Sequence, residues 1–169
     1  MASATPTRFN ISRVGGWNVP ARKSRVRLGS ASSTTHDTPR CAIWAGMGTG
    51  KTKASLWAWR YLNRAGFAKK LLVVAPLSTL NFTWAREIFN TLPDVRVAVL
   101  YGDRKKRLKL LADTKVDIYI VNHDGLTILA DEIEKRLDID SVVLDELATY
   151  RNGTATRTKV TRKVTKRMK

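Results

Sequence analysis

The chain has 169 residues, of which 43% are hydrophobic, and it carries a formal net charge of +17. This length and composition indicate one globular domain with a real hydrophobic core. A single cysteine excludes an internal disulfide bond, and the absence of an apolar run of about 18 residues excludes a membrane-spanning helix. The polar N-terminus lacks the apolar stretch of a secretory signal, so we expect a cytoplasmic protein that is not secreted.

The positive charge is concentrated towards the two ends of the chain. Residues 1–40 carry a net charge of +6, residues 41–150 of +3 and residues 151–169 of +8. Basic segments favour polyanions, and nucleic acid first, although charge alone leaves a solubilising tail as an alternative. We therefore divide the chain into a basic, mostly irregular arm, a globular lobe and a basic tail (residues 1–39, 40–153 and 154–169).

From residue 40 onward, apolar runs typical of strands alternate with segments typical of helices. We expect strands at residues 41–44, 71–75, 95–100, 117–121 and 139–144. We expect helices between them, at residues 53–65, 79–92, 103–112 and 124–137. Strands and helices in repeated alternation form right-handed crossovers, so the pattern predicts an α/β fold, a parallel sheet of about five strands with helices on both faces.

The expected first strand and first helix flank a segment with the spacing of a phosphate-binding loop, residues 45–52. Its glycines let the backbone curl so that several N–H groups point inward, and the start of a helix favours an anion. The expected phosphate-binding residues are Gly46, Met47, Gly48, Thr49, Gly50, Lys51 and Thr52. Lys51 would reach the β- and γ-phosphates of a nucleoside triphosphate, and the Thr52 hydroxyl would bind Mg²⁺. The alternative is a flexible glycine turn with an exposed lysine.

Such a loop needs a second, acidic site to hold the metal ion and orient water, and residues 142–146 supply one. An apolar run ends there in Asp145 and Glu146, which places both carboxylates at the carboxyl edge of a buried strand, where ligands bind in open α/β sheets. Asp145 would hold Mg²⁺, directly or through water, and Glu146 would polarise the attacking water. The alternative is an ordinary strand end with solvated acids, and the upstream loop favours the functional interpretation.

The basic tail carries an apolar stripe at helical spacing, formed by Val160, Val164 and Met168. This narrow stripe among Lys and Arg residues predicts either a basic helix docked on the lobe or a helix that orders only on a partner. The two alternatives differ in whether the stripe is buried in the free protein.

Two further segments carry a recognisable pattern: residues 72–80, followed by Trp84 and Glu87, and residues 101–102, followed by residues 104–106. Together with the phosphate loop and residues 145–152, they resemble motifs of superfamily 2 helicases and translocases. The similarity is to the first RecA-like lobe of the Swi/Snf-type branch, and within it to phage-encoded DNA helicases. The phosphate loop resembles motif I, the segment at residue 72 resembles motif Ia, and the acidic segment resembles motif II. The resemblance spans roughly residues 40–157.

The resemblance implies a RecA-like lobe that binds ATP and Mg²⁺ in a DNA-dependent ATPase, with Lys51 and Glu146 as catalytic residues. It also implies contacts with DNA backbone phosphates, which suit a motor that ignores base sequence. The expected nucleic-acid contacts are Ser78, Thr79, Tyr101, Gly102, Asn122 and His123. Helix capping is the alternative role of Ser78 and Thr79, and a structural role is the alternative for His123. The tryptophans expected to pack in the core and between helices are Trp44, Trp57, Trp59 and Trp84.

The sequence departs from the family pattern in ways that bear on activity. It contains no glutamine, so no residue matches the adenine-reading Gln that the family places upstream of motif I. We expect no motif III and no second RecA-like lobe within this chain, so the facing lobe would lie on a further segment or on a partner chain. Without the arginine finger of that lobe, worth ~10³ or more in rate, the chain alone should bind ATP weakly and hydrolyse it poorly. A phage-encoded motor of this type would act in the host cytoplasm.

Two other functions fit parts of the pattern. A small-molecule P-loop kinase needs an Arg-rich acceptor lid after its core, and residues 157–169 have that composition, although residues 150–152 argue against it. A non-catalytic nucleic-acid-binding protein would use the basic arms and ignore the phosphate loop.

Overall fold

A computed structural model describes residues 48–168 of the chain. The expected arm (residues 1–39), the expected first strand (residues 41–44) and the loop residues Gly46 and Met47 lie outside the described residues. Within the described range, four strands form one parallel sheet in the order β2-β3-β1-β4. The strands are β1 (Lys70–Ala75), β2 (Val97–Val99), β3 (Ile118–Asn122) and β4 (Ile139–Leu144).

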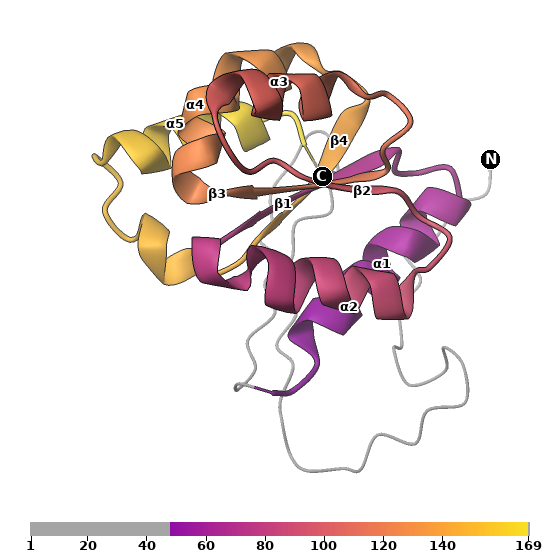
Figure 1. Cartoon of the computed structure of the whole chain (residues 1–169). Helices are drawn as coiled ribbons and strands as arrows, with labels where there is room; N and C mark the ends of the chain where they lie inside the picture. Colours follow the sequence, from indigo (N-terminus) through magenta and orange to yellow (C-terminus); the bar gives the residue numbers. More distant parts are fainter. Residues whose placement is uncertain (1–47, 169) are drawn as a thin grey trace, which may run out of the picture.

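Helices cover both faces of this sheet, so the expected α/β architecture is confirmed (Figure 1). One face carries α1 (Lys51–Arg64) and α2 (Arg86–Thr91), and the other carries α3 (Arg104–Ala112), α4 (His123–Lys135) and α5 (Thr156–Thr165). The remaining helical segments of the described range are the 3-10 turns Leu77–Thr79 and Leu147–Tyr150 and the π-helix η3 (Leu80–Ala85). Within residues 48–168, no helix combines the length and the apolar character needed to cross a membrane.

The strands alternate their side chains between two apolar layers. Leu71 and Val73 of β1 pack with α1, η3 and α2, whereas Leu72 and Val74 pack with α3, α4 and α5. All four side chains are at most 1% exposed. Because both faces are covered, β1 is a continuous apolar run, as is usual for a central strand of a parallel sheet.

The helix expected at residues 79–92 differs from the prediction over its first half. A 3-10 turn and the π-helix η3 come first, and only α2 is α-helical. Leu80, Trp84 and Ile88 are all buried, at a spacing of four residues that is wider than the 3.6-residue α-helical turn. Side chains four residues apart also share one face of an α-helix, so the burial of Leu80 and Trp84 fits either kind of turn and does not account for the difference.

The basic tail is docked, because α5 packs against α4. Val164 is fully buried and joins the apolar layer that α3 and α4 form with the sheet. The guanidinium of Arg167 donates to the carbonyl oxygens of Ile133, Arg136 and Ile139 at 2.9–3.0 Å. Two of these acceptors, Ile133 and Arg136, lie at the C-terminal end of α4, so Arg167 adds a side-chain donor to the last carbonyl oxygens of α4.

Candidate nucleotide and nucleic-acid site

The carboxyl ends of the four strands lie along one edge of the sheet, because every strand pair is parallel. Thr79 follows β1, Tyr101 follows β2 and Asn122 ends β3. Asp145 follows β4, and its N–H donates to the carbonyl oxygen of Val74 on β1 at 2.8 Å. The structure therefore brings the expected nucleic-acid segments and the expected metal carboxylate to the same edge.

The phosphate loop ends in two glycines with left-handed backbone. Gly48 has a φ of 72° and Gly50 a φ of 80°, and a Cβ at either position would meet no atom within 4 Å. The role of both glycines is therefore conformational, since residues with a side chain rarely adopt this backbone. Lys51 and Thr52 begin α1, which has no side-chain cap and no acidic residue in its first turn. A helix start of this kind behind a glycine turn fits a phosphate group.

The two carboxylates of the acidic pair differ in environment. Asp145 is half-buried: its Oδ2 accepts a hydrogen bond from the indole Nε1 of Trp84 at 2.9 Å, and its Oδ1 accepts one from the N–H of Glu146 at 3.0 Å. Glu146 is exposed and has a φ of 55°, the only positive φ of a non-glycine residue within residues 48–168. Such backbone costs of order 1–3 kcal/mol and tends to occur at functional sites. The pair thus combines a fixed carboxylate with an exposed one.

The chemistry of this edge suits Mg²⁺ bound together with phosphate. Among the described residues, no group of three or more His, Cys, Asp or Glu side chains gathers as in a metal site built from protein alone. Magnesium usually binds through one or two carboxylates together with substrate phosphates and water. Asp145 and the Thr52 hydroxyl would supply the protein share of such a site.

The segment formed by η3 and α2 contacts both halves of the site. Glu87 of α2 forms an ion pair with Lys53, which lies in the first turn of α1; the distance from Oε1 of Glu87 to Nζ of Lys53 is 3.6 Å. Trp84 of η3 contacts Asp145 at the end of β4. The sequence predicts Trp84 only as a packing residue, because its spacing from the neighbouring apolar residues gives no sign of a partner far along the chain.

A buried arginine connects two of the expected nucleic-acid segments. Arg107 of α3 is 9% exposed, its Nε donates to the carbonyl oxygen of Gly102 at 2.7 Å, and its Nη1 donates to Oδ1 of Asn122 at 3.1 Å. Gly125 leaves room for it, since a Cβ there would lie 2.0 Å from Nη1 of Arg107. From sequence alone, Arg107 is expected only as part of a helix at residues 103–112. The sequence feature that indicates the inward orientation of Arg107 is its spacing of four residues from Leu111, which is buried one helical turn later.

His123 is buried at the start of α4. Its Nδ1 lies 2.6 Å from the hydroxyl oxygen of Tyr150, and the two rings meet edge to face. Burial lowers the pKa of His123, and the nearby Arg157 guanidinium lowers it further. The contact with the half-buried Tyr150 favours the structural alternative for His123, in which it joins α4 to the 3-10 turn that follows Glu146.

The other expected nucleic-acid residues are more accessible. Ser78 is exposed, and Tyr101 is 50% exposed. The hydroxyl of Thr79 donates to the carbonyl oxygen of Pro76 at 3.0 Å, a local side-chain-to-backbone contact, and Thr79 makes no side-chain capping hydrogen bond to η3. Gly102 has a φ of 109°, so the chain turns there in a way that favours glycine.

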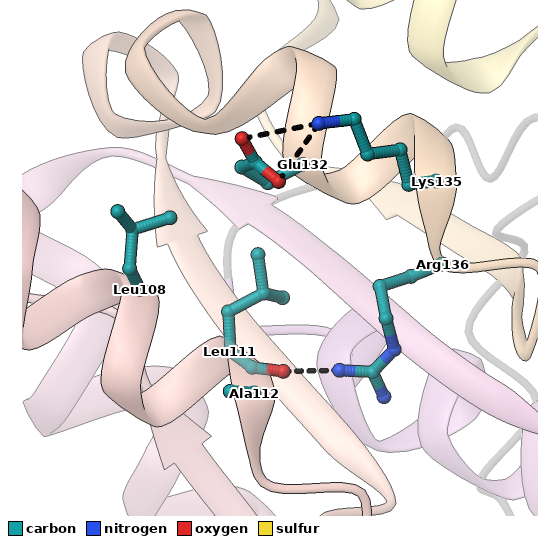
Figure 2. Close-up of a pocket in the computed structure, with 6 residues that line it drawn as sticks. All are labelled: Leu108, Leu111, Ala112, Glu132, Lys135 and Arg136. Carbon is teal, nitrogen blue, oxygen red and sulfur yellow. Dashed lines mark hydrogen bonds and ion pairs between the residues drawn. The ribbon is translucent and has the colours of Figure 1, made fainter.

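Two hollows lie at different edges of the described lobe. The larger, of about 400 Å³, lies at the starts of α4 and α5 and is lined by Asp124, Thr127, Ile128, Thr156 and Arg157. The smaller, of about 210 Å³, is lined by Leu108, Leu111, Ala112, Glu132, Lys135 and Arg136. Figure 2 shows this second hollow between α3 and α4, where Lys135 pairs with Glu132 at 3.3 Å and Arg136 donates to the carbonyl oxygen of Leu111. It lies at the C-terminal ends of both helices, away from the edge that carries the candidate site.

Fold and site together define a class of protein, the RecA-like P-loop ATPases: an α/β lobe with a phosphate loop at a helix start and an acidic pair at a strand end. The model of one family within this class, the SNF2-related domain, matches residues 32–169. The chain belongs to this family and corresponds to a first RecA-like lobe of the Swi/Snf type.

The chain is similar to proteins from a phage, a yeast and an archaeon. It is 34% identical over 113 residues to protein p41 of Acyrthosiphon pisum secondary endosymbiont phage 1, a match that covers 65% of this chain and 25% of that protein. It is 31% identical over 129 residues to the ISWI chromatin-remodeling complex ATPase ISW1 of Saccharomyces cerevisiae, covering 72% of this chain and 11% of that protein. Among solved structures, the Sulfolobus solfataricus SWI2/SNF2 ATPase core in complex with dsDNA matches with a TM-score of 0.59 and 25% identity, covering 70% of this chain and 24% of that one. The chain thus spans a quarter or less of the length of each of these relatives.

Proposed function

We propose that this lobe binds ATP and Mg²⁺ at the phosphate loop and acidic pair, and DNA backbone phosphates along the same edge of the sheet. The observation that carries the proposal is the shared edge: Asp145 and the segments at Thr79, Tyr101 and Asn122 all follow the carboxyl ends of parallel strands. Ligands of open α/β sheets bind at this edge.

Each residue of the nucleotide site has a distinct task in this proposal. Lys51 and the N–H groups at the start of α1 neutralise and orient the phosphates, and Thr52 and Asp145 hold Mg²⁺. The bound ion would neutralise charge on the phosphate oxygens. Glu146, exposed and next to Asp145, orients the attacking water.

The cations at the start of α3 favour a polyanion on this edge. Arg104, Lys105 and Lys106 are exposed in the first turn of α3, where no acidic residue follows the capping Asp103. The helix macrodipole disfavours a cation at this position by about 0.3–1 kcal/mol. Cations placed here at a cost in stability support a role in binding phosphates, and the DNA bound to the Sulfolobus relative supports DNA as the polyanion.

Rapid hydrolysis would need a second RecA-like lobe, on a further segment or on a partner chain. That lobe would supply an arginine finger, worth ~10³ or more in rate. We therefore expect the chain alone to bind ATP and to hydrolyse it slowly, with or without DNA. Rapid hydrolysis by this chain alone would contradict the need for a second lobe.

Nucleotide binding by a Lys51→Ala variant tests the proposal. We expect its affinity for a fluorescent ATP analogue with Mg²⁺ to fall by about 10–100-fold, since hydrogen bonds to charged groups are worth about 1.5–3 kcal/mol. Lys69→Ala is the matched control: Lys69 is exposed next to the start of β1, at the opposite edge of the sheet, so its removal should leave the affinity unchanged. Equal affinity of Lys51→Ala and the wild-type chain would show that the loop does not bind phosphate.

Assays on the wild-type chain also distinguish the proposed function from the two alternatives. Phosphoryl transfer to a small-molecule acceptor instead of water would favour a kinase. DNA binding without any nucleotide binding would favour a non-catalytic nucleic-acid-binding protein.

A further inference from the structure

The side chain of Trp84 reaches from η3 to the end of β4. Its indole Nε1 donates to Oδ2 of Asp145 at 2.9 Å, between residues that lie 61 positions apart in the sequence. Trp84 is 2% exposed, so the donor is shielded from water. From this geometry we propose that Trp84 is a positioning residue that holds the Asp145 carboxylate in the orientation that binds Mg²⁺. The inference rests on the proposed function of Asp145.

Both oxygens of the Asp145 carboxylate have a hydrogen-bond donor. Oδ2 accepts from Trp84, and Oδ1 accepts from the N–H of Glu146 at 3.0 Å. Donors on both oxygens limit rotation of the carboxylate, so its remaining lone pairs point in fixed directions. Metal-binding carboxylates are usually held in this way, and loss of such a partner typically costs about 10–100-fold in metal affinity or activity.

The shape of η3 fixes the indole that makes this contact. Leu80 and Ile88, four residues before and after Trp84, are at most 1% exposed, so Trp84 is anchored from both sides along the segment. Short π-helical turns are rare and occur frequently at functional sites. The 3-10 turn that leads into η3 contains Ser78 and Thr79, so one continuous segment joins expected phosphate contacts to the partner of Asp145.

A second buried tryptophan provides a matched control. Trp59 of α1 is 3% exposed, belongs to the same apolar layer as Trp84, and its Nε1 has no hydrogen-bond partner among the described residues. Trp59→Phe and Trp84→Phe therefore remove the same group from the same layer. Only Trp84→Phe also removes a donor from Asp145.

The test is a Mg²⁺ titration of nucleotide binding by the full chain, with a fluorescent ATP analogue as the probe. For Trp84→Phe we expect half-maximal binding to need about tenfold more Mg²⁺ than for the wild type. For Trp59→Phe we expect the wild-type value. Affinity for the analogue in EDTA, which depends on the phosphate loop, should be the same in all three proteins.

Equal Mg²⁺ dependence of the Trp84→Phe and Trp59→Phe variants would overturn the inference while leaving the proposed function intact. A wild-type chain that binds the analogue without any dependence on Mg²⁺ would overturn the inference too. A wild-type chain that binds no nucleotide at all would contradict the proposed function, and the role of Trp84 with it.

A nucleotide-free measurement tests the hydrogen bond itself, whether or not Trp84→Phe folds well. The chain has five tryptophans, and the indole N–H resonance of Trp84 can be assigned in the wild-type protein by NMR. We expect Asp145→Ala, which removes the acceptor, to shift this resonance strongly, and the Trp59 resonance to stay in place. An unshifted Trp84 resonance in Asp145→Ala would also overturn the inference.

Discussion

At the scale of single residues, Arg107 shows how the lobe buries a cation without a carboxylate partner among residues 48–168. Burial of a charge is unfavourable unless hydrogen bonds replace the lost water. The carbonyl oxygen of Gly102 and the amide oxygen of Asn122 supply those bonds, and the missing side chain of Gly125 supplies the space. As a result, the segments that follow β2 and β3 are held in one fixed arrangement.

We predict that Gly125→Ala destabilises the lobe by roughly 1–3 kcal/mol in urea unfolding. Inside a helix such as α4, alanine is normally favoured over glycine by about 1 kcal/mol, so the expected sign is the reverse of the usual one. The reason is that the new Cβ would lie 2.0 Å from Nη1 of Arg107 and 2.6 Å from Oδ1 of Asn122. The guanidinium must move and lose its hydrogen bonds.

Gly153→Ala is the control for this prediction, because a Cβ at residue 153 meets open space, and its effect should stay within about 0.5 kcal/mol. Gly125→Ala combined with Arg107→Ala should cost less than the sum of the two single variants, since the same hydrogen bonds are lost only once. Additive costs would show that the clash with Arg107 is not the cause.

At the scale of helices and strands, local patterns predict the elements well where burial follows a regular period. The apolar run of β1 and the strand at β4, which has the predicted bounds, are examples. The π-helical turn of η3 is not predictable in this way, because buried residues four apart, such as Leu80 and Trp84, fit an α-helix equally well. The sequence predicts that Asp145 lies at a strand end. It contains no local pattern that identifies Trp84, 61 positions away, as the partner of Asp145.

An ion-pair network joins the end of α4 to the strands. Asp138 accepts from Nε and Nη2 of Arg136 at 2.8 and 2.7 Å, and the Nζ of Lys70 lies 3.1 Å from its Oδ2. The hydrogen bonds from Arg136, and then from Lys70, hold the pKa of Asp138 well below its usual range. The folded state therefore prefers the ionised carboxylate.

We predict that Asp138→Asn destabilises the lobe at neutral pH by roughly 1–2 kcal/mol, a value reduced by the partial exposure of the pair. Because the pKa of Asp138 is lower in the folded state, its contribution is fully present above the ordinary aspartate pKa of about 3.9 and is lost as the pH falls below that value. Urea unfolding of both proteins from pH 7 down to pH 3 should show the difference shrinking. Asp131→Asn, at a side chain that is 82% exposed, should have no measurable effect at any pH. A difference for Asp138→Asn that is constant with pH would contradict the ionic origin.

At the scale of the whole molecule, the parallel sheet gives the lobe two chemically different edges. The carboxyl edge carries the acidic pair, the starts of α3 and α4, and the exposed cations of residues 104–106. The amino edge carries Lys69, which is also exposed, but none of the segments expected to meet a ligand. A net charge of +17 favours DNA binding whatever the site, so affinity alone does not identify the binding edge.

The salt dependence of DNA binding can show at which of the two edges DNA binds. Each phosphate contact that a cation makes contributes about 0.9 to the slope of log affinity against log salt concentration on duplex DNA. We predict that Arg104→Gln lowers this slope by about 0.9 and that Lys69→Gln, the same change of charge at the amino edge, leaves it unaltered. Arg104 lies at a helix start that disfavours cations, so its loss should not destabilise the fold, and weaker binding would reflect the lost contact. Equal slopes for the two variants would mean that DNA is held by general attraction to a basic surface, and the carboxyl edge would then serve the nucleotide alone.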